Sequence, residues 1–304
     1  MFGCITFIMC KKPIQIVIFF LITAIGFAQP YSDIVSFTYQ HFSSHYKNNP
    51  DLKNQTDNYM LNVLYPKQFK NGNVFLLRIN AELLRSSVNF EGNNTSNVSS
   101  IAMPIGFQWV SKSKKWKTVV MGISKLASNF EGALTAKDFQ YGGLFLENYE
   151  VNENLKLKFG LYYNREAFGN FFVPLLGVDW KATDRIYLYG ILPSNYKIEF
   201  NVVKNKVYTG LDFKWLTRSF NLSDSNPENY MRFEEVFLKA FAEYFIYKNI
   251  LLSTGVGYSF GKSPLQYTTT TDEVNDGSAI YAPLKNYSVF NFGISYRIRD
   301  DIRK

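Results

Sequence analysis

Residues 196–215 read YKIEFNVVKNKVYTGLDFKW, and apolar and polar residues alternate on both sides of the dipeptide Lys204-Asn205. Successive side chains of a β-strand point to opposite faces, so each half of the segment has one apolar and one polar face. A tight turn at Lys204-Asn205 would join the halves into an antiparallel hairpin. Similar alternation recurs from about residue 73 to residue 299, which predicts an all-β chain.

Alternation and turn signals together predict fourteen strands. The predicted ranges are 32–42, 59–66, 73–89, 98–111, 116–129, 140–150, 155–165, 170–181, 185–192, 195–203, 206–217, 230–247, 250–260 and 285–299. The first two are the weakest, so twelve strands is the alternative. Several reach the roughly 9–11 residues that cross a bilayer at barrel tilt. We therefore expect residues 29–304 to form a single antiparallel up-and-down transmembrane β-barrel.

The connections between these strands alternate in length. Short turns fall at 111–115, 151–154, 182–184, 204–205 and 248–249, and longer links at 91–97, 131–139, 166–169, 219–229 and 261–284. Outer-membrane barrels place short turns in the periplasm and long loops outside, so an even strand count puts both termini in the periplasm. The two-residue link Pro193-Ser194 is an exception to this alternation.

Residues 1–28 have the pattern of a cleaved signal peptide. Its parts are the basic pair Lys11-Lys12, the apolar run 14–25 and the small-residue cleavage site Gly26-Phe27-Ala28, and Met9 is a second candidate start. The apolar run of about 15 residues is shorter than the roughly 20 of a spanning helix. We expect export through the general secretory pathway to the outer membrane.

The composition fits a barrel and excludes other classes of protein. Aromatic residues are 17% of the chain, with 28 Phe and 21 Tyr, and barrels need aromatic girdles at both membrane interfaces. Both cysteines, Cys4 and Cys10, lie in the signal segment, which excludes disulfides from the mature chain. The formal charge of +8 is carried by scattered residues rather than a basic patch, which argues against nucleic acid as a partner.

Charged residues on the polar faces should point into the lumen, because Arg or Lys at the lipid-facing midplane costs roughly 2–4 kcal/mol. The lumen-facing candidates are Arg78, Glu82, Lys197, Glu199, Asp212, Lys214, Glu235, Lys239 and Glu243. Their mixed signs predict internal ion pairs and a plugged or restricted lumen rather than a wide pore. Small solutes are the expected cargo, and no cofactor is expected.

Few residues suggest catalysis or metal binding. His41 and His45 are the only histidines; a Ser/His hydrolase or two-His metal site is weighed against plain loop-end histidines, which we favour because no motif supplies an Asp orienter. Asp272, Glu273 and Asp276 lack the order of a calcium loop and read as a solvated loop. Glu234 and Glu235 are adjacent on a strand, so they should face opposite ways. Gly255 and Gly257 precede no helix, so they indicate close strand packing.

Four short motifs give the chain a family resemblance. They are Gly177-Val178-Asp179-Trp180, Ile191-Leu192-Pro193, Tyr196-Lys197-Ile198-Glu199 and Tyr208-Thr209-Gly210-Leu211-Asp212. With them the chain resembles Gram-negative outer-membrane β-barrels of the domain-of-unknown-function family numbered 6268. The resemblance implies a barrel in the outer membrane and carries no catalytic residues.

The function expected from sequence is therefore a non-enzymatic outer-membrane barrel serving restricted permeation of small solutes or envelope integrity. Its expected partners are outer-membrane lipids, lipopolysaccharide and, during biogenesis, the barrel assembly machinery. One alternative is a soluble secreted or periplasmic β-protein that binds a ligand. A second is an outer-membrane lipid or peptide hydrolase.

Overall fold

The computed structural model describes residues 30–47, 50–51, 53–88, 94–223, 229–260, 265–268, 278–279 and 284–299. The predicted signal peptide and the acidic cluster Asp272, Glu273 and Asp276 lie outside these ranges. No helix in the described part is long and apolar enough to cross a membrane.

Fourteen strands close into one antiparallel up-and-down barrel, which confirms the predicted fold and rejects the twelve-strand alternative. They are β1 (Tyr31–His45), β2 (Lys53–Gln68), β3 (Val74–Val88), β4 (Asn94–Val110), β5 (Trp116–Ser128), β6 (Phe139–Asn152), β7 (Leu155–Glu166), β8 (Gly169–Lys181), β9 (Ile186–Leu192), β10 (Asn195–Val203), β11 (Val207–Asn221), β12 (Asn229–Tyr247), β13 (Ile250–Ser259) and β16 (Tyr287–Arg299). The short strands β14 (Leu265–Thr268) and β15 (Ser278–Ala279) extend the sheet beyond β12, and η1 (Ala136–Asp138) is a 3₁₀ turn.

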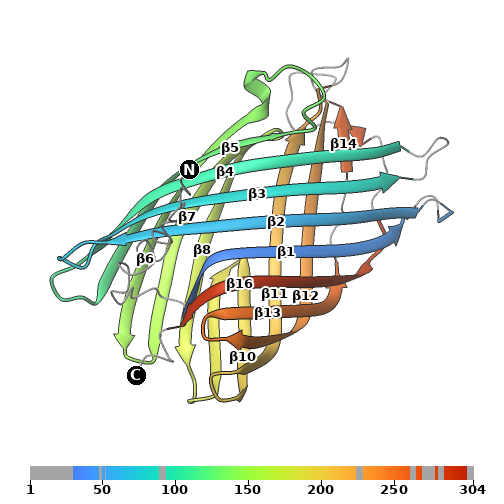
Figure 1. The fold of residues 1–304 in the computed structure, drawn as a ribbon. Coiled ribbons are helices and arrows are strands. Elements are labelled where there is room, and N and C mark those ends of the chain that lie inside the picture. The colour runs from blue at the N-terminus through green and yellow to red at the C-terminus, as the bar shows by residue number, and fades with distance from the viewer. Residues whose placement is uncertain are drawn as a thin grey trace, which may run out of the picture.

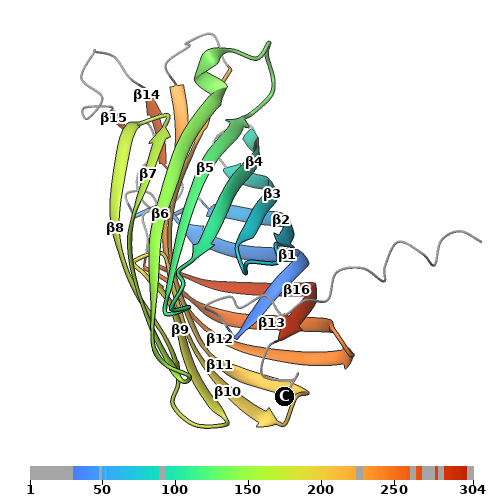
Figure 2. The same ribbon diagram turned by 90° about the vertical axis from the view of Figure 1, so that its left-hand side faces the viewer.

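Each barrel strand pairs with its neighbours in sequence, and the pairing of β1 with β16 closes the ring. Figure 1 shows β1–β4 side by side, with β16 and β13 continuing the same wall below them. Figure 2 shows the opposite wall, where β6, β7 and β8 run up the barrel. The first two strands, weakest in sequence, are in fact long, with 15 and 16 residues.

The two ends of the barrel differ in their connections. The first residue of β1 pairs with the last of β16, Tyr31 with Arg299, so both strands reach one end, here called the turn end. The connections there are 69–73, 111–115, 153–154, 182–185, 204–206 and 248–249. The other end, the loop end, carries most of the longer connections, but the expectation of a longer link at 166–169 is wrong. There β7 and β8 are hydrogen-bonded up to a two-residue turn, Ala167-Phe168.

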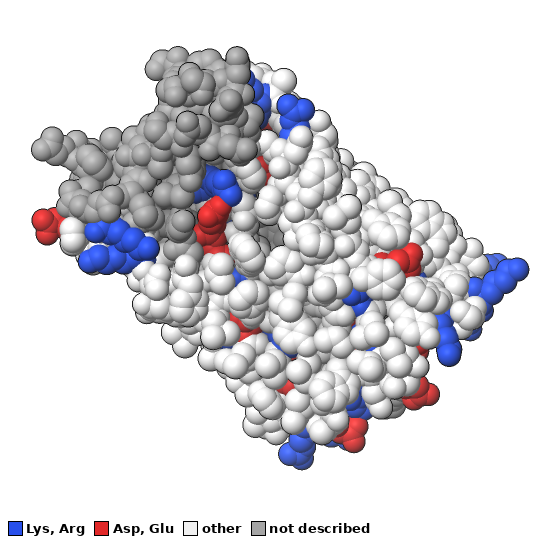
Figure 3. All heavy atoms as spheres, turned by 180° about the vertical axis from the view of Figure 1, so that it is seen from behind, with Lys and Arg blue, Asp and Glu red and all other residues white. Residues whose placement is uncertain are grey.

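The outer surface of the barrel is apolar. Outward side chains of the strands are the large exposed hydrophobic groups of the molecule, for example Ile101 and Met103 on β4, Leu157 on β7, and Phe290 and Phe292 on β16. Figure 3 shows one face as a broad uncharged surface, with most Lys and Arg toward its ends. A closed barrel leaves no unpaired edge around most of its circumference and turns this surface outward. That surface suits lipid and is unsuited to water.

Candidate functional site: the barrel interior

The inward residues of the strands make up the candidate site. Of the nine charged candidates, Arg78, Lys197, Asp212, Lys214, Lys239 and Glu243 line an interior cavity. Glu199 and Glu235 are fully buried in ion pairs, and Glu82 is paired with an arginine from across the interior. The nine come from four strands, β3, β10, β11 and β12, and the structure gathers them into separate groups at the two ends and the middle of the barrel.

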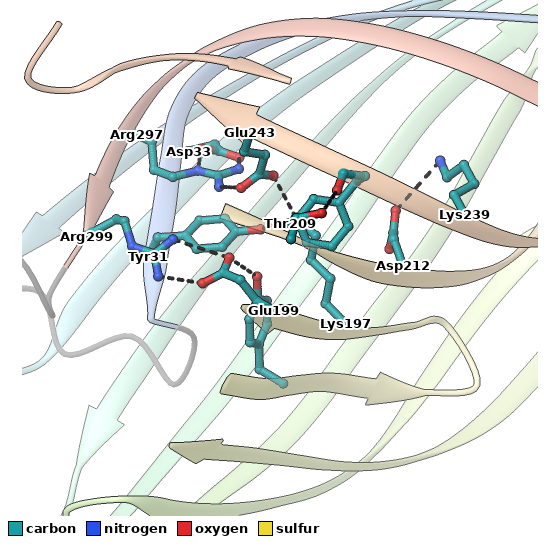
Figure 4. Close-up of polar contacts among 12 residues, drawn as sticks. Tyr31, Asp33, Lys197, Glu199, Thr209, Asp212, Lys239, Glu243, Arg297 and Arg299 are labelled. Carbon is teal, nitrogen blue, oxygen red and sulfur yellow. Dashed lines mark hydrogen bonds and ion pairs between the residues drawn. The ribbon is translucent and has the colours of Figure 1, made fainter. Parts of the chain in front are cut away.

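Arg297 of β16 is the centre of the first group, which lies toward the turn end (Figure 4). Its Nε and Nη2 donate to the two carboxylate oxygens of Asp33 at 2.6 and 2.9 Å, and its Nη1 donates to Oε2 of Glu243 at 2.6 Å. Lys197 donates from Nζ to the other oxygen of Glu243 at 2.7 Å. Glu243 thus binds cations from two walls, and these bonds satisfy charges that would be costly to bury alone.

Arg299 extends this group across the interior. It donates from Nη2 to Oε1 of Glu199 at 2.7 Å, and Tyr189 donates to Oε2 of the same carboxylate at 2.9 Å. The ring of Tyr31 lies beside them, with the guanidinium of Arg297 3.5 Å from its centroid. In the sheet, β10 and β16 are separated by three strands, so these contacts bridge the barrel. We call these eight residues, Tyr31, Asp33, Tyr189, Lys197, Glu199, Glu243, Arg297 and Arg299, the turn-end network.

A second ionic group lies nearer the loop end. Arg218 of β11 contacts the carboxylates of both Glu82 on β3 and Glu235 on β12. Asn58 of β2 donates to Glu82 at 2.8 Å. Strands β3 and β11 are far apart around the ring of strands, so the contact of Arg218 with Glu82 also bridges the interior.

An apolar cluster fills the interior beyond Arg218. It consists of Leu84, Val98, Ala127, Phe220, Leu222, Met231 and Phe233, here called the loop-end plug. Its members come from β3, β4 and β5 on one side and from β11, β12 and Leu222, which follows β11, on the other. The end of β11 reaches β5 directly, where Asn221 pairs with Ser128. The last residues of β11, which remain paired with β12, therefore reach across the mouth of the barrel to β5.

The cavity between the two levels has a volume of about 1020 Å³ and two kinds of wall. Leu64, Leu76, Val119, Leu146 and Leu175 form an apolar wall on β2, β3, β5, β6 and β8. The charged side chains lining the cavity are Arg78, Lys117, Lys158, Lys197, Lys214, Lys239 and Arg297 against Asp33, Asp212 and Glu243. Basic groups therefore outnumber acidic ones in the lining.

Three cations of this lining, Lys214, Lys239 and Arg78, are weakly compensated. Asp212 is shared between Lys239, at 3.7 Å, and Lys214, at 4.0 Å. Among the described residues, no carboxylate lies within ion-pair distance of Arg78, whose exposed side chain lines the cavity. The cavity therefore presents positive charge from β3, β11 and β12 together with its apolar wall.

Four charged residues of these interior groups are absent from the sequence candidates. Arg297 alternates with the outward Tyr296 and Ile298, so its inward direction was readable, and Arg299 continues that parity. Arg218 shares the parity of Asp212 but lies one residue beyond the predicted end of its strand. Asp33 was hidden, because a register shift between Asp33 and Val35 changes the alternation of β1.

The histidines lie elsewhere, and the expectation of two loop-end histidines is wrong for His41. His41 lies within strand β1, and its side chain points to the outer face of the barrel. Its Nδ1 is 2.8 Å from Oδ1 of Asp57, its partner on the neighbouring strand β2. No sequence motif had indicated this aspartate. Tyr39 donates to the same oxygen at 2.6 Å. This outward group faces away from the cavity, while His45 ends β1.

The remaining sequence candidates lie on the strands as follows. Glu234 and Glu235 do face opposite ways, since Glu235 contacts Arg218 inside and Glu234 contacts Arg232. A Cβ added to Gly257 would lie 2.2 Å from the carbonyl oxygen of Leu238, so this glycine permits close strand packing. Within the described ranges no group of His, Cys, Asp and Glu could hold a metal ion.

Comparison with known proteins finds only solved structures of low similarity, among them outer-membrane channels and a porin. No protein-family model and no curated protein sequence matches the chain, so membership of the family suggested by sequence is not confirmed. An outer-membrane channel from Pseudomonas putida F1 is 11% identical with a TM-score of 0.42, over 87% of this chain and 94% of that one. The NanC porin is 7% identical with a TM-score of 0.37, over 86% and 100%.

A third solved structure, a mutant of the TodX monoaromatic hydrocarbon channel, is 11% identical with a TM-score of 0.39, over 87% of this chain and 89% of that one. Scores of this size carry no argument about what this chain handles. The fold rests on its own strand pairing.

Proposed function

We propose that this chain is a non-enzymatic outer-membrane β-barrel that restricts passage along its axis and holds small molecules in an interior cavity. The observation that carries the proposal is the double obstruction of the interior. The turn-end network bridges the barrel at one level, and Arg218 with the loop-end plug bridges it at another. A wide aqueous pore needs an interior free of such contacts.

The apolar exterior supports a membrane location over a soluble ligand-binding β-protein. In the proposed orientation the turn end faces the periplasm, because outer-membrane barrels place their short turns there. Lipids and lipopolysaccharide would surround the wall, and the assembly machinery would receive the chain after export. Cleavage after residue 28 is part of this proposal, and N-terminal sequencing of the mature protein tests it: a start at Gln29 supports it and a start at Met1 or Met9 contradicts it.

The hydrolase alternative has less support. A hydrolase needs a nucleophile within hydrogen-bond reach of its base. In the part of the chain that the structure describes, His41 contacts Asp57 and no serine or threonine hydroxyl is bonded to its ring.

Two measurements test the proposed function. The unboiled protein should migrate faster than the boiled protein in SDS gels, because a closed barrel stays folded in cold detergent. Proteoliposomes placed in sugars of graded size should swell at rates close to those of protein-free liposomes. Rapid swelling in disaccharides, as for an open porin, would contradict an obstructed interior.

A further inference from the structure

Within the described residues, the strand pairing of the barrel wall breaks off beside β9 and β10. These are the shortest strands of the barrel, with 7 and 9 residues. The pairing of β8 with β9 ends at Leu176, although β8 continues to Gly169. The pairing of β11 with β10 ends at Lys214, although β11 continues to Asn221. In Figure 2, β8 rises well beyond β9.

Segment 169–175 of β8 is paired only with β7, and segment 215–218 of β11 only with β12, and the two segments do not pair with each other. Below them lies the turn Pro193-Ser194, where the amide of Trp215 donates to the carbonyl of Ser194 at 2.9 Å. This is the short link that departs from the alternation of loop lengths. We call the opening framed by these segments the wall window.

Polar contacts close the window on its loop-end side. The carboxylate of Glu166 accepts hydrogen bonds from the amide and hydroxyl of Ser219 at 2.9 and 2.7 Å. The amide of Ala167 donates to the same hydroxyl at 2.8 Å, and Gln140 donates to the carbonyl of Ser219 at 3.0 Å. The window extends along β11 from Trp215 to Ser219, a rise of roughly 13 Å. Paired strands, in contrast, lie only about 4.8 Å apart. These contacts fasten β11 to β6 and β7 while leaving its lower segment apart from β8.

The cavity reaches the window. Its lining includes the consecutive residues 171–175 of β8 and 214–217 of β11, so both faces of each strand border it. On β5 and β6 the lining residues alternate, as expected of an intact wall. Consecutive runs on β1, Ser36–Thr38, and on β2, Asn62–Leu64, lie where these strands are paired with neighbours on both sides and make no opening. The window is therefore identified by the missing strand pairing together with the lining. The outward Phe172 and Leu176 are 62% and 67% exposed, among the highest values for apolar side chains.

The sequence at the window suits an unpaired edge. Pro174 has no N–H group, so it removes one donor that the missing strand would otherwise have satisfied. Open strand edges are not tolerated in hydrocarbon unless they line a hydrated cavity, and these edges border the cavity.

The cavity and the window together define a ligand chemistry. The apolar wall includes Val119, Leu146 and Leu175, and Leu175 belongs to the edge of the window. Lys214 is the last residue of β11 that pairs with β10, and it and Arg78 are weakly compensated cations of the lining. An apolar chain against one wall and an anionic head group near these cations would match both.

From this geometry we infer that the barrel takes up a single-chain anionic amphiphile through the wall window, with its tail against Leu146 and Leu175 and its head group near Lys214 and Arg78. The inference rests on the proposed function, since it names the class of molecule that the obstructed barrel holds. Entry from the side is consistent with an axis bridged at both levels.

The test measures binding of radiolabelled dodecanoate to the full chain in phosphatidylcholine nanodiscs, with empty nanodiscs subtracted. Wild-type protein is expected to bind dodecanoate saturably and dodecyltrimethylammonium, the cation with the same tail, at least about tenfold more weakly. Lys214→Glu is expected to raise the Kd for dodecanoate about tenfold, because it reverses the charge beside the head group. Lys204→Glu, the same change at a remote exposed turn, should leave the Kd within about twofold.

The route is tested with a bulky maleimide attached after folding, in a chain whose Cys4 and Cys10 are replaced by serine. Labelling at Thr217→Cys, on the window edge, is expected to slow association at least about tenfold. Labelling at Leu211→Cys, an outward position of the same strand where β11 is paired, should leave the rate unchanged.

Each result separates the parts of the account. Absence of saturable dodecanoate binding, or equal binding of both probes, overturns the ligand class, while sugar swelling still tests the obstructed axis. Unchanged association after labelling at Thr217→Cys overturns the lateral route. Rapid swelling together with dodecanoate binding contradicts the proposed function alone.

Discussion

Arg299 on β16 donates to Glu199 on β10 at 2.7 Å across the interior of the barrel, and both side chains are almost completely buried. The chain brings them together from positions 100 residues apart in sequence. The contact fastens the end of the last strand to β10, from which three strands separate it in the sheet. It therefore belongs to the closure of the barrel as well as to the obstruction of its lumen.

Glu199→Ala should reduce the free energy of unfolding by about 3–5 kcal/mol, because it leaves a buried arginine without its carboxylate. The measurement is urea unfolding of the protein in lipid vesicles. Asp184→Ala is the control, since the Asp184–Lys181 pair is exposed and should add nothing measurable. Equal stability of Glu199→Ala and wild type would show that the buried pair does not hold the barrel.

The hydrogen bonds to the carboxylate of Asp138, at the loop end, should be sensitive to acid. Burial opposes ionisation, but hydrogen bonds from Ser128, Thr135 and Asn221 outweigh it and hold the pKa of this carboxyl below its usual value of 3.8. A depressed folded-state pKa gives stability that is present above pH 3.8 and is lost as pH falls through the folded pKa. The rate of proteolytic cleavage within residues 129–138 should therefore increase as the pH falls below 3.8 and through the folded-state pKa.

The control for this pH dependence is Asp138→Asn, which has no charge to lose. Its loop should be cleaved faster than that of wild type at neutral pH and show little further change on acidification. A wild-type cleavage rate that is flat down to pH values well below 3.8 would refute the role of Asp138.

Position 210, occupied by glycine, should not tolerate a side chain. Its φ is +153°, and a Cβ there would lie 1.9 Å from the carbonyl oxygen of Ile198. Gly210→Ala should therefore cost at least the roughly 1–3 kcal/mol of a strained backbone. Gly122→Ala is the matched control, because nothing lies within 4 Å of its added Cβ. Urea unfolding compares them, and equal losses would contradict the packing described here.

Substitution of Phe220 tests how much the loop-end plug contributes to the free energy of unfolding. Phe220 is fully buried and packs edge-on against Phe233 at a centroid distance of 5.7 Å. Phe220→Ala should cost about 3–5 kcal/mol through the cavity it leaves. Phe200→Ala, at an outward position that is 41% exposed, should cost less. If the two variants unfold alike, the plug does not stabilise the mouth of the barrel.

The strands were readable from sequence because a barrel wall has one face to lipid and one to its interior. That environment makes apolar and polar residues alternate, as Tyr196, Ile198 and Phe200 do with Lys197 and Glu199. The rule fails where its physical basis ends. From Arg218 to Asn221 every residue is buried, because β11 there crosses the mouth and is covered on both faces. Alternation cannot mark such a segment as strand.

The sequence could not predict which charged side chains pair with one another inside the barrel. Parity places Glu199 and Glu243 inward but cannot choose which arginine each one binds, since that depends on how opposite walls meet. Asp33 escaped because of the register shift that follows it. The wall window was invisible as well: the short link Pro193-Ser194 was noted as an exception, but only the pairing of β8 and β11 shows that the wall opens beside it.

Single-channel recording of the wild-type protein in planar lipid bilayers tests the central claim most directly. An axis bridged by the turn-end network and the loop-end plug predicts no stable open-pore conductance steps. Sustained steps of the size given by a general porin would contradict it.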